Sequence, residues 1–381
     1  MRTTWLRLIV LVLAAVAFSA CQKEEGGTAY DYYVFATLAG SGQVASFSMD
    51  SSTGRLTEVT GSPVAAGTEP QSLAAVTVNT STVDVLGHYL YVANYFSDSV
   101  SAYTIDAASG ALTAVTGSPF SAGLGPYALT IEPAGKFAYV ANADGDSIWP
   151  YSIDPDTGVL SPFGTLAVAA GFHPSSITAD PAGLFVYAAN EYSGNITVYA
   201  INVGSGELTA IAGSPFATGG YPRSVAISPD GKFAYAANTT TRNVAGFAVD
   251  STTGSLAVIA GSPYTSGNNA AAVAVDPSSK FVYVANMEAS TISAYEINPD
   301  TGALTAVSGS PFVTGAAPVS VAVDPSGQYL FVANYWGDSI SGYSINSTTG
   351  ALTEMSKSPF LVADGAHPSS ITAIRIARQG P

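Results

Sequence analysis

The sequence predicts an all-β protein, a seven-bladed β-propeller built from four-stranded antiparallel blades. The first reason is an internal repeat, because the string Tyr/Phe-Val/Ala-Ala-Asn recurs at a constant spacing of 48 residues and ends at Asn94, Asn142, Asn190, Asn238, Asn286 and Asn334. The second is a series of short alternating apolar runs separated by turn sequences, a pattern typical of strands. The third is the size of the unit, since four antiparallel strands in about 40 to 50 residues are typical of a propeller blade.

Four strands follow one another within each repeat. In the fifth repeat, SVAISP predicts the first strand, FAYAAN the second and NVAGFAVD the third, and an LTAV-like segment closing on Gly-Ser-Pro-Phe predicts the fourth in most copies. Pro-Asp-Gly-Lys predicts a tight turn between the first two strands, because Pro fixes φ and Gly accepts a positive φ. Asp250 with Gly254 four positions later predicts the hairpin loop before the fourth strand.

The chain begins and ends inside one repeat. Second strands start with YYVFAT near residue 33, whereas first strands start only at 72 to 78 and finish with SSITAIRI at 369–376. We therefore expect the C-terminal segment to supply the missing first strand of the N-terminal blade. This pairing would close the ring without a covalent bond and remove an open sheet edge. An insertion, TVNTSTVDVLGH at 77–88, lengthens the first interval.

Residues 1–20 predict an export signal. Arg2 and Arg7 come before an apolar run, LIVLVLAAVAF, that is too short to span a bilayer. Cys21, the only cysteine, follows Ser19-Ala20 and resembles the lipobox of bacterial lipoproteins. That resemblance implies lipidation at Cys21 and, with Gln22 next, an outer-membrane location. An ordinary signal peptide cut after Ala20 is the alternative. Residues 21–29 would then form a tether and residues 30–381 the propeller.

The composition limits the partners of this protein. Charged residues are 10% of the chain and the formal net charge is −15, so the surface repels nucleic acid and anionic lipid headgroups. We expect no nucleic-acid partner, no cofactor, and contact with a membrane only through the lipid anchor. With a single cysteine, no internal disulfide can form, and stability must come from a core.

The YVAN strings, followed by AYxID, TGxLT and GSPF, resemble the YVTN-type repeats of the seven-bladed lactonase-like propellers, which include 6-phosphogluconolactonase-like proteins. The resemblance covers essentially the whole mature chain and implies the propeller fold and lactone hydrolysis. Members of this family often show Pro-Arg-His before a first strand and Asn-Glu at the end of the following second strand. Here Ser224 follows Pro222-Arg223, and Asn190-Glu191 lies one blade earlier.

The repeat also distinguishes structural residues from residues of a ligand site. A feature found in every blade is structural, whereas a single ligand site must break the seven-fold symmetry. We expect the recurring Asn and Tyr residues to be structural. The loops before the first strands and after the second strands should open on one face of the channel, and they differ from blade to blade. The candidate ligand-binding residues in these loops are Glu69, Gln71, Tyr127, Tyr192, Arg242, Asn269, Tyr335 and Trp336.

Four residues of the same loops are candidates for catalysis. His173 and His367 should face each other across the channel mouth, and either could act as a general base near neutral pH. Arg223 could hold a carboxylate or phosphate. Glu191, on the adjacent blade, could orient the base or serve as the counter-ion of Arg223. The alternative for the histidines is a structural His-Pro turn at the rim.

One loop suggests a metal, because Asn-Ala-Asp-Gly-Asp-Ser at 142–147 resembles part of a calcium-binding loop. Asp144 and Asp146 are therefore secondary candidates for metal ligands. The distant bidentate Glu of a full calcium loop is missing, so the main expectation is a polar turn and no metal site.

Two functions follow from these patterns. The first is a cell-envelope lipoprotein whose propeller acts as a binding or scaffold module, with a small-molecule or protein ligand at the channel face. The alternative is a metal-independent lactone hydrolase, a carboxylic-ester hydrolase that acts on a sugar lactone or a similar cyclic ester.

Overall fold

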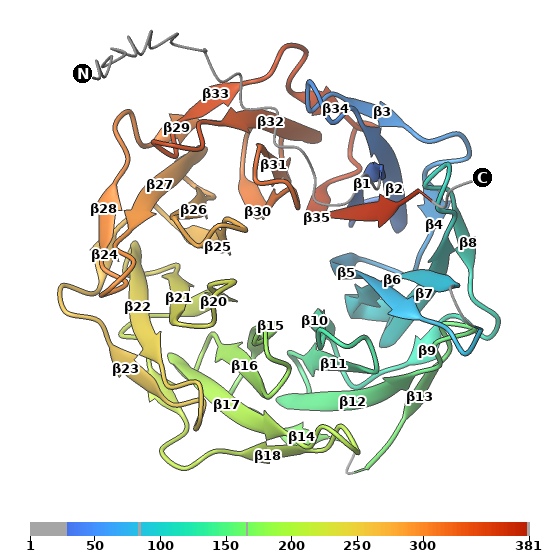
Figure 1. Ribbon diagram of the computed structural model, residues 1–381, viewed down its shortest axis with the longest axis horizontal. Helices are drawn as coiled ribbons and strands as arrows, with labels where there is room; N and C mark the ends of the chain where they lie inside the picture. Colours follow the sequence, from blue (N-terminus) through green and yellow to red (C-terminus); the bar gives the residue numbers. More distant parts are fainter. Residues whose placement is uncertain (1–28, 83–84, 165–166, 379–381) are drawn as a thin grey trace, which may run out of the picture.

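The computed structural model describes residues 29–82, 85–164 and 167–378. These residues form seven sheets arranged radially around a central channel, which confirms the seven-bladed β-propeller (Figure 1). Strand pairs within each sheet are antiparallel, and the first strands of neighbouring blades contact one another around the channel. Residues 1–28, which include the predicted signal and Cys21, lie outside the described chain.

The first strands line the channel and the second strands pack outside them. In order from blade 1 to blade 7, the first strands are β35 (Pro368–Ala377), β5 (Pro70–Asn79), β10 (Pro126–Ile131), β15 (Pro174–Ala179), β20 (Pro222–Ile227), β25 (Ala270–Val275) and β30 (Pro318–Val323). The second strands are β1 (Tyr30–Leu38), β6 (Leu86–Asn94), β11 (Phe137–Asn142), β16 (Phe185–Asn190), β21 (Phe233–Asn238), β26 (Phe281–Asn286) and β31 (Tyr329–Asn334).

The outer part of each blade consists of a long third strand with two short segments beside it. The third strands are β2 (Gln43–Met49), β7 (Ser99–Ile105), β12 (Ser147–Ile153), β17 (Asn195–Ile201), β22 (Asn243–Val249), β27 (Thr291–Ile297) and β32 (Ser339–Ile345). The fourth strands are β3 (Leu56–Glu58), β8 (Leu112–Ala114), β13 (Leu160–Pro162), β18 (Leu208–Ala210), β23 (Leu256–Val258), β28 (Leu304–Ala306) and β33 (Leu352–Glu354).

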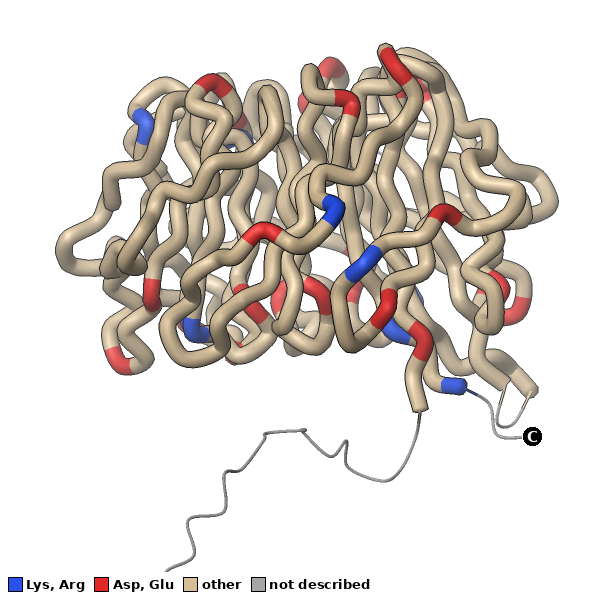
Figure 2. The backbone as a smooth tube through the Cα atoms, turned by 90° about the horizontal axis from the view of Figure 1, so that it is seen from above, with Lys and Arg blue, Asp and Glu red and all other residues tan. Residues whose placement is uncertain are grey.

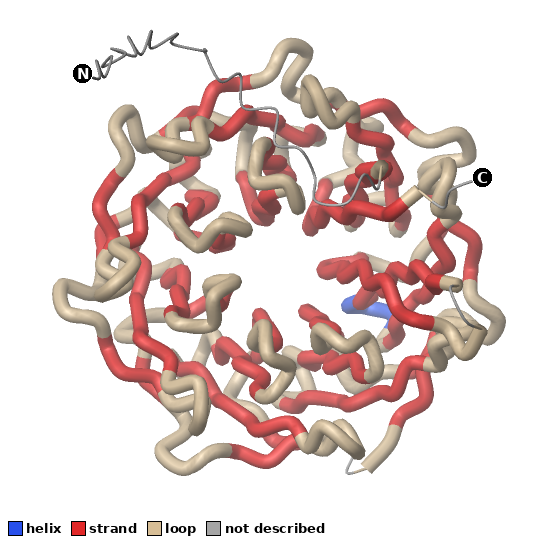
Figure 3. Tube along the Cα trace, in the orientation of Figure 1, coloured by secondary structure: helices blue, strands red, loops and turns tan. Residues whose placement is uncertain are grey.

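The predicted fourth strand is interrupted at its Gly-Ser-Pro sequence, and a two-residue segment resumes pairing with the third strand. These segments are β4 (Val64–Ala65), β9 (Phe120–Ser121), β14 (Val168–Ala169), β19 (Phe216–Ala217), β24 (Tyr264–Thr265), β29 (Phe312–Val313) and β34 (Phe360–Leu361). Strands and loops account for nearly all of the described chain, with one 3₁₀ turn, η1 (Tyr95–Ser97), beside the channel (Figure 3). No helix of the described residues has the length and apolar character needed to cross a membrane.

The C-terminal strand closes the ring as expected. Strand β35 pairs with β1 from Tyr30 opposite Ala377 to Leu38 opposite Pro368. Arg378 forms a bidentate ion pair with Asp31, in which Nε lies 3.0 Å from Oδ2 and Nη2 lies 2.6 Å from Oδ1. Both ends of the described chain therefore lie side by side on one face of the ring (Figure 2). The opposite face holds the loops that precede the first strands.

Recurring tyrosines join neighbouring blades, which explains why they repeat. The Tyr187 hydroxyl of blade 4 donates to the Gly254 carbonyl of blade 5 at 3.2 Å, and its side chain is fully buried. In the opposite direction, the Tyr199 hydroxyl donates to the Ala169 carbonyl of blade 3 at 2.5 Å. A buried phenol supplies a large apolar surface and needs one partner for its hydroxyl, and both requirements are met at the joints between blades.

Three of the recurring asparagines hold the loops at the mouth in place. Asn94, Asn190 and Asn286 each accept a hydrogen bond at Oδ1 from the backbone N–H of a glycine in the loop before the first strand, at 3.0 to 3.1 Å. Their Nδ2 groups donate to side-chain oxygens on the third strand of the same blade. These residues are buried and structural, as their repetition predicts.

Candidate functional site

Each first strand begins with a bulge that turns one side chain toward the channel. In blade 3 the pairing of β10 with β11 shifts between Pro126 and Ala128, so Tyr127 has no partner across the ladder. A bulge re-aims the side chain of the extra residue. The same shift occurs in all seven described blades, and the residues at this position, here called the bulge ring, are Gln71, Tyr127, Ser175, Arg223, Ala271, Val319 and Ser369.

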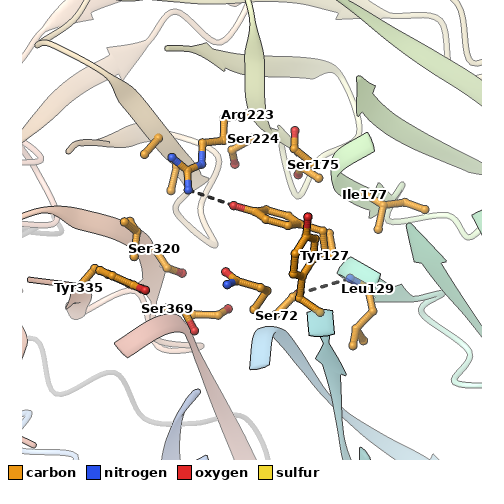
Figure 4. Close-up of a pocket in the computed structure, with 18 of the residues that line it drawn as sticks. Ser72, Tyr127, Leu129, Ser175, Ile177, Arg223, Ser224, Ser320, Tyr335 and Ser369 are labelled. Atoms are coloured by element: carbon orange, nitrogen blue, oxygen red, sulfur yellow. Dashed lines mark hydrogen bonds between the residues drawn. The ribbon is translucent and has the colours of Figure 1, made fainter. Parts of the chain in front are cut away.

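The bulge ring surrounds a cavity of about 410 Å³ at the channel mouth, with all seven of its side chains in the lining. Glu69, Tyr95, Met287 and Tyr335 of the surrounding loops complete the wall near the rim. Figure 4 shows Arg223 and Tyr127 pointing toward each other across part of this space, with serine hydroxyls around them. A volume of several hundred cubic ångströms suits a small organic ligand.

Arg223 is the basic residue of the lining, and it has no acidic partner there. Its Nη2 donates to the Tyr127 hydroxyl oxygen at 3.0 Å, and its Nη1 lies 3.8 Å from the Met287 sulfur. No carboxylate of the described residues forms an ion pair with Arg223. The electrostatic effect of Tyr127 raises the pKa of Arg223, and Glu191 adds to this, against the effect of burial. The guanidinium is therefore charged and available to an anion.

Glu69 is the acidic residue of the lining. Its Oε1 accepts a hydrogen bond from Gln71 Nε2 at 2.9 Å, so a bulge-ring amide orients the carboxylate. Burial raises the pKa of Glu69, and the hydrogen bond from Gln71 offsets part of this increase. A carboxyl group with a raised pKa is a better base than an ordinary one.

Tyr95 and Tyr335 also line the cavity, and the pKa of each is raised. Burial, followed by the hydrogen bond to Asp144, raises the pKa of Tyr95 to about 12. Burial, and then the charge of Glu69, raises the pKa of Tyr335. Both hydroxyls are therefore protonated at neutral pH and act as hydrogen-bond donors, with Tyr95 donating to Asp144 at 2.9 Å.

The lining is chemically uneven. Blades 2 to 5 contribute Gln71, Tyr127, Ser175 and Arg223 to the bulge ring, whereas blades 6 and 7 contribute Ala271 and Val319. Within the bulge ring, the two apolar side chains are therefore neighbours, although Ser320 and Tyr335 of blade 7 add hydroxyls to that side of the lining.

Five of the residues predicted from the sequence line the cavity: Glu69, Gln71, Tyr127, Arg223 and Tyr335. The other predicted site residues lie in the mouth loops outside the lining: His173, His367, Glu191, Tyr192, Arg242, Asn269 and Trp336. Arg242 is exposed, and Asn269 Nδ2 approaches Glu288 Oε1 at 3.4 Å. Trp336 is 62% exposed and packs edge-on against Tyr335 and His367.

Both histidines occupy the position just before a first strand, with a positive φ of 55° at His173 and 51° at His367. His173 Nδ1 lies 3.4 Å from Glu191 Oε2 without the alignment of a hydrogen bond, and its ring stacks on Tyr192. His367 Nδ1 lies 3.2 Å from Asp338 Oδ1, and its ring stacks on Tyr335. Glu191 is thus beside His173, while Arg223 is bonded to Tyr127.

The two aspartates of the calcium-like loop have partners within the protein. Asp146 Oδ1 accepts a hydrogen bond from the backbone N–H of His173 at 2.8 Å, and Asp144 accepts one from Tyr95. Asp338 makes the same contact with the N–H of His367 at 2.8 Å. Among the described residues no group of three His, Cys, Asp or Glu side chains is placed to hold a metal ion.

Sequence reasoning missed the serines and the apolar members of the bulge ring. Ser175, Ala271, Val319 and Ser369 carry no distinctive chemistry in the sequence, although each follows the first residue of a first strand. Their position in the repeat was the available signal. The bulge that turns them inward depends on pairing with the second strand, which residue types alone do not specify.

Comparison with protein families shows which family this chain belongs to. The family described as "Lactonase, 7-bladed beta-propeller" matches residues 31–171, 167–267 and 257–365. The chain belongs to this lactonase family of seven-bladed propellers. A search of the curated proteins found no match.

Solved structures resemble this lactonase-family propeller over nearly its whole length. A proposed 6-phosphogluconolactonase of Bacteroides uniformis has a TM-score of 0.76 and 21% identity, covering 90% of this chain and 99% of its own. A proposed 6-phosphogluconolactonase of Bacteroides fragilis has a TM-score of 0.75 and 22% identity, covering 90% and 98%. The periplasmic gluconolactonase of Pseudomonas aeruginosa has a TM-score of 0.72 and 20% identity, covering 91% and 99%. At these identities the likeness shows the shared fold.

Proposed function

We propose that this lactonase-family propeller hydrolyses a sugar-type lactone in the cavity of the bulge ring. The observation that carries the proposal is Arg223, a charged guanidinium that faces the cavity with a phenol, and no carboxylate, as its partner. Family membership and the lactonases among the similar structures support hydrolysis over a purely scaffolding role.

The reaction adds water across an ester bond. Glu69 takes a proton from water, and the water oxygen forms a bond to the lactone carbonyl carbon. Arg223 and the Tyr127 hydroxyl stabilise the negative charge that develops on the carbonyl oxygen, which is the role of an oxyanion hole. The ring C–O bond then breaks, and the ring oxygen takes the proton held by Glu69 and becomes a hydroxyl, which restores the carboxylate of Glu69. The new carboxyl group releases its proton to solvent, so the product is a hydroxy acid whose carboxylate faces Arg223. We assign the base to Glu69, and not to His173 or His367, because Glu69 lines the cavity.

The test is hydrolysis of D-glucono-δ-lactone by the purified chain, followed as acid release and corrected for spontaneous hydrolysis. Arg223→Gln is expected to lower kcat/KM by about 10²- to 10³-fold, the effect of removing one oxyanion-hole donor. Arg55→Gln, which changes an exposed arginine on a distant hairpin loop, is the matched control and should keep full activity. Turnover by Arg223→Gln equal to that of the unchanged chain would contradict the assignment.

We also propose that the mouth faces away from a membrane if the predicted lipidation occurs. The described chain begins beside Tyr30, at the end of β1 that pairs with Ala377, whereas the mouth lies at the Leu38 end. A lipid on Cys21 would therefore tether the ring by the face opposite the cavity. Labelling with a radioactive fatty acid, and its loss in Cys21→Ser, tests the anchor.

A further inference from the structure

A row of aromatic rings runs along the mouth from blade 2 to blade 5. Its successive centroid distances are 5.0 Å for Phe96–Tyr95, 5.9 Å for Tyr95–Tyr127, 5.7 Å for Tyr127–His173, 4.5 Å for His173–Tyr192 and 6.4 Å for Tyr192–Tyr221. We call these six rings the aromatic arc. The middle of the arc lines the cavity, whereas both of its ends lie outside on the rim.

The end of the arc on blades 4 and 5 is built as a platform. Tyr192 is 63% exposed, yet its ring is stacked on His173 with an interplanar angle of 28°. One face of Tyr192 is therefore packed against His173, and much of the ring remains open to solvent. His173 is fixed by its backbone bond to Asp146 and by its approach to Glu191. Tyr221, 43% exposed, meets Tyr192 edge-on and continues the surface.

This platform lies next to the anion-binding group of the cavity. Tyr221 precedes Pro222 and Arg223 in the chain, so the platform and the guanidinium belong to the same loop and strand. Contacts between rings also connect the two: Tyr127 accepts the hydrogen bond from Arg223, and its ring lies 5.7 Å from that of His173. The His173 ring in turn stacks on Tyr192 at 4.5 Å. A ligand whose acidic end binds Arg223 can therefore extend over Tyr192.

The chemistry of this combination selects one class of ligand. Exposed tyrosine faces bind the apolar faces of pyranose rings, and serine hydroxyls with nearby carboxylates suit sugar hydroxyls. Repeated anionic groups are disfavoured, because Glu191 lies beside the platform and the whole chain carries a formal charge of −15. One acid group at the end of an otherwise neutral sugar chain satisfies both conditions.

We propose that the ligand of this site is a glycosylated aldonic acid or its lactone, with the acid or lactone end in the cavity at Arg223 and the attached neutral sugar stacked on Tyr192. The inference rests on the proposed function and deepens it by naming the substrate class. His173 is then a positioning residue, because it holds Tyr192 and does not touch the reacting atoms. The class of reaction that supplies such a lactone is oxidation at the reducing end of an oligosaccharide.

The experiment measures binding of gluconate, maltobionate and maltotrionate to the purified chain by titration calorimetry. Maltobionate is expected to bind about three- to tenfold more tightly than gluconate, the gain of one aromatic stacking contact. Tyr192→Ala should remove this gain and leave the affinity for gluconate within about twofold. Tyr192→Phe should retain the gain, because it keeps the ring and loses only the hydroxyl.

Phe96→Ala is the matched control, since Phe96 is an equally exposed aromatic (68%) at the other end of the arc. It should preserve the gain from gluconate to maltobionate. Equal affinity for the three acids, or a gain that survives in Tyr192→Ala, would overturn the inference. Turnover of gluconolactone without any gain for maltobionate would overturn the inference and leave the proposed hydrolysis standing. Tighter binding of maltobionate than of gluconate, without turnover of any lactone, would overturn the proposed hydrolysis and leave the inference about the ligand standing.

Discussion

The blade bodies and the bulge ring use the same backbone in opposite ways. In the blade bodies one position has almost the same side chain in each copy, as in Tyr139, Tyr187, Tyr235 and Tyr283, each of which bonds a glycine carbonyl of the next blade. In the bulge ring the backbone shift also repeats seven times in the described chain, yet its side chains range from alanine to arginine.

The difference follows from what surrounds each position. A second-strand tyrosine is enclosed by the neighbouring blade, so a change of size or polarity leaves a cavity or an unpaired group. A bulge residue has the cavity on one side of its side chain, so its size and polarity can differ from blade to blade. In this molecule the regular part therefore specifies the ring, and the irregular part specifies the ligand.

Loss of ring closure should have the largest effect on the blade bodies. Truncation after His367 removes β35 and leaves β1 without its partner strand. We expect a loss comparable with the total stability of a domain, about 5–15 kcal/mol, and exposure of an open sheet edge. Thermal unfolding and size-exclusion chromatography measure this. A chain that ends at Arg378 is the control and should melt like the full protein, whereas equal melting temperatures for both truncations would refute the role of β35.

A break in one joint between blades should have a smaller effect. Tyr187→Ala removes a fully buried ring and should cost about 3–5 kcal/mol in the free energy of unfolding. Tyr187→Phe loses only the bond to Gly254 and should cost about 1 kcal/mol. Phe331 occupies the equivalent position of blade 7, which shows that an aromatic side chain without a hydroxyl fits there. Denaturant unfolding distinguishes the two variants, and similar losses in both would show that the hydroxyl, not the packing, dominates.

In the cavity that the bulge ring surrounds, removal of the acidic charge should lower activity. Glu69→Gln should lower kcat/KM for gluconolactone by about 10²-fold. Because burial raises the pKa of Glu69, hydrolysis by the unchanged protein should slow with decreasing pH through a pKa above that of an ordinary glutamate, if the proposed function holds. Glu69→Gln should lack this acidic limb, and an identical pH profile in the variant would argue against Glu69 as the base.

The same substitution has a definite consequence for stability. A raised pKa in the folded state means that folding favours the neutral carboxyl group. This contribution is complete below the pKa of the unfolded chain and is lost as pH rises through the folded pKa. Glu69→Gln should therefore be at least as stable as the unchanged protein at pH 7. A clear drop in melting temperature at pH 7 would contradict this expectation.

The smallest effect should come from the contacts between neighbouring first strands. Ser320 Oγ accepts a hydrogen bond from the backbone N–H of Ile371 at 3.2 Å, which links blade 7 to β35. Blades 3 and 6 carry Ala128 and Ala272 at this position, so the contact is dispensable in some joints. Ser320→Ala should cost about 1 kcal/mol in the free energy of unfolding. The exposed Ser52→Ala is the control, and a loss above about 3 kcal/mol would indicate an additional role for Ser320.

The sequence predicted those features that depend on local pattern and repetition. Strand alternation, turn residues and the spacing of the asparagines depend on backbone geometry within one blade, so they are visible in a single copy and reinforced by the others. The closure by residues 368–377 was predictable for the same reason, since the count of first and second strands leaves one vacancy. The mouth loops were predictable as a group because their residues differ from blade to blade at one end of the channel.

The tertiary structure decided which residues of the mouth share one cavity. Glu69 and Arg223 come from blades 2 and 5 and meet in one lining, whereas His173 and His367, more suggestive in the sequence, lie in the loops around it. One residue separates His173 from Ser175, yet the bulge directs only Ser175 into the cavity. Sequence specifies the type of each side chain, but its direction at the channel depends on a register shift between paired strands, which exists only in the assembled sheet.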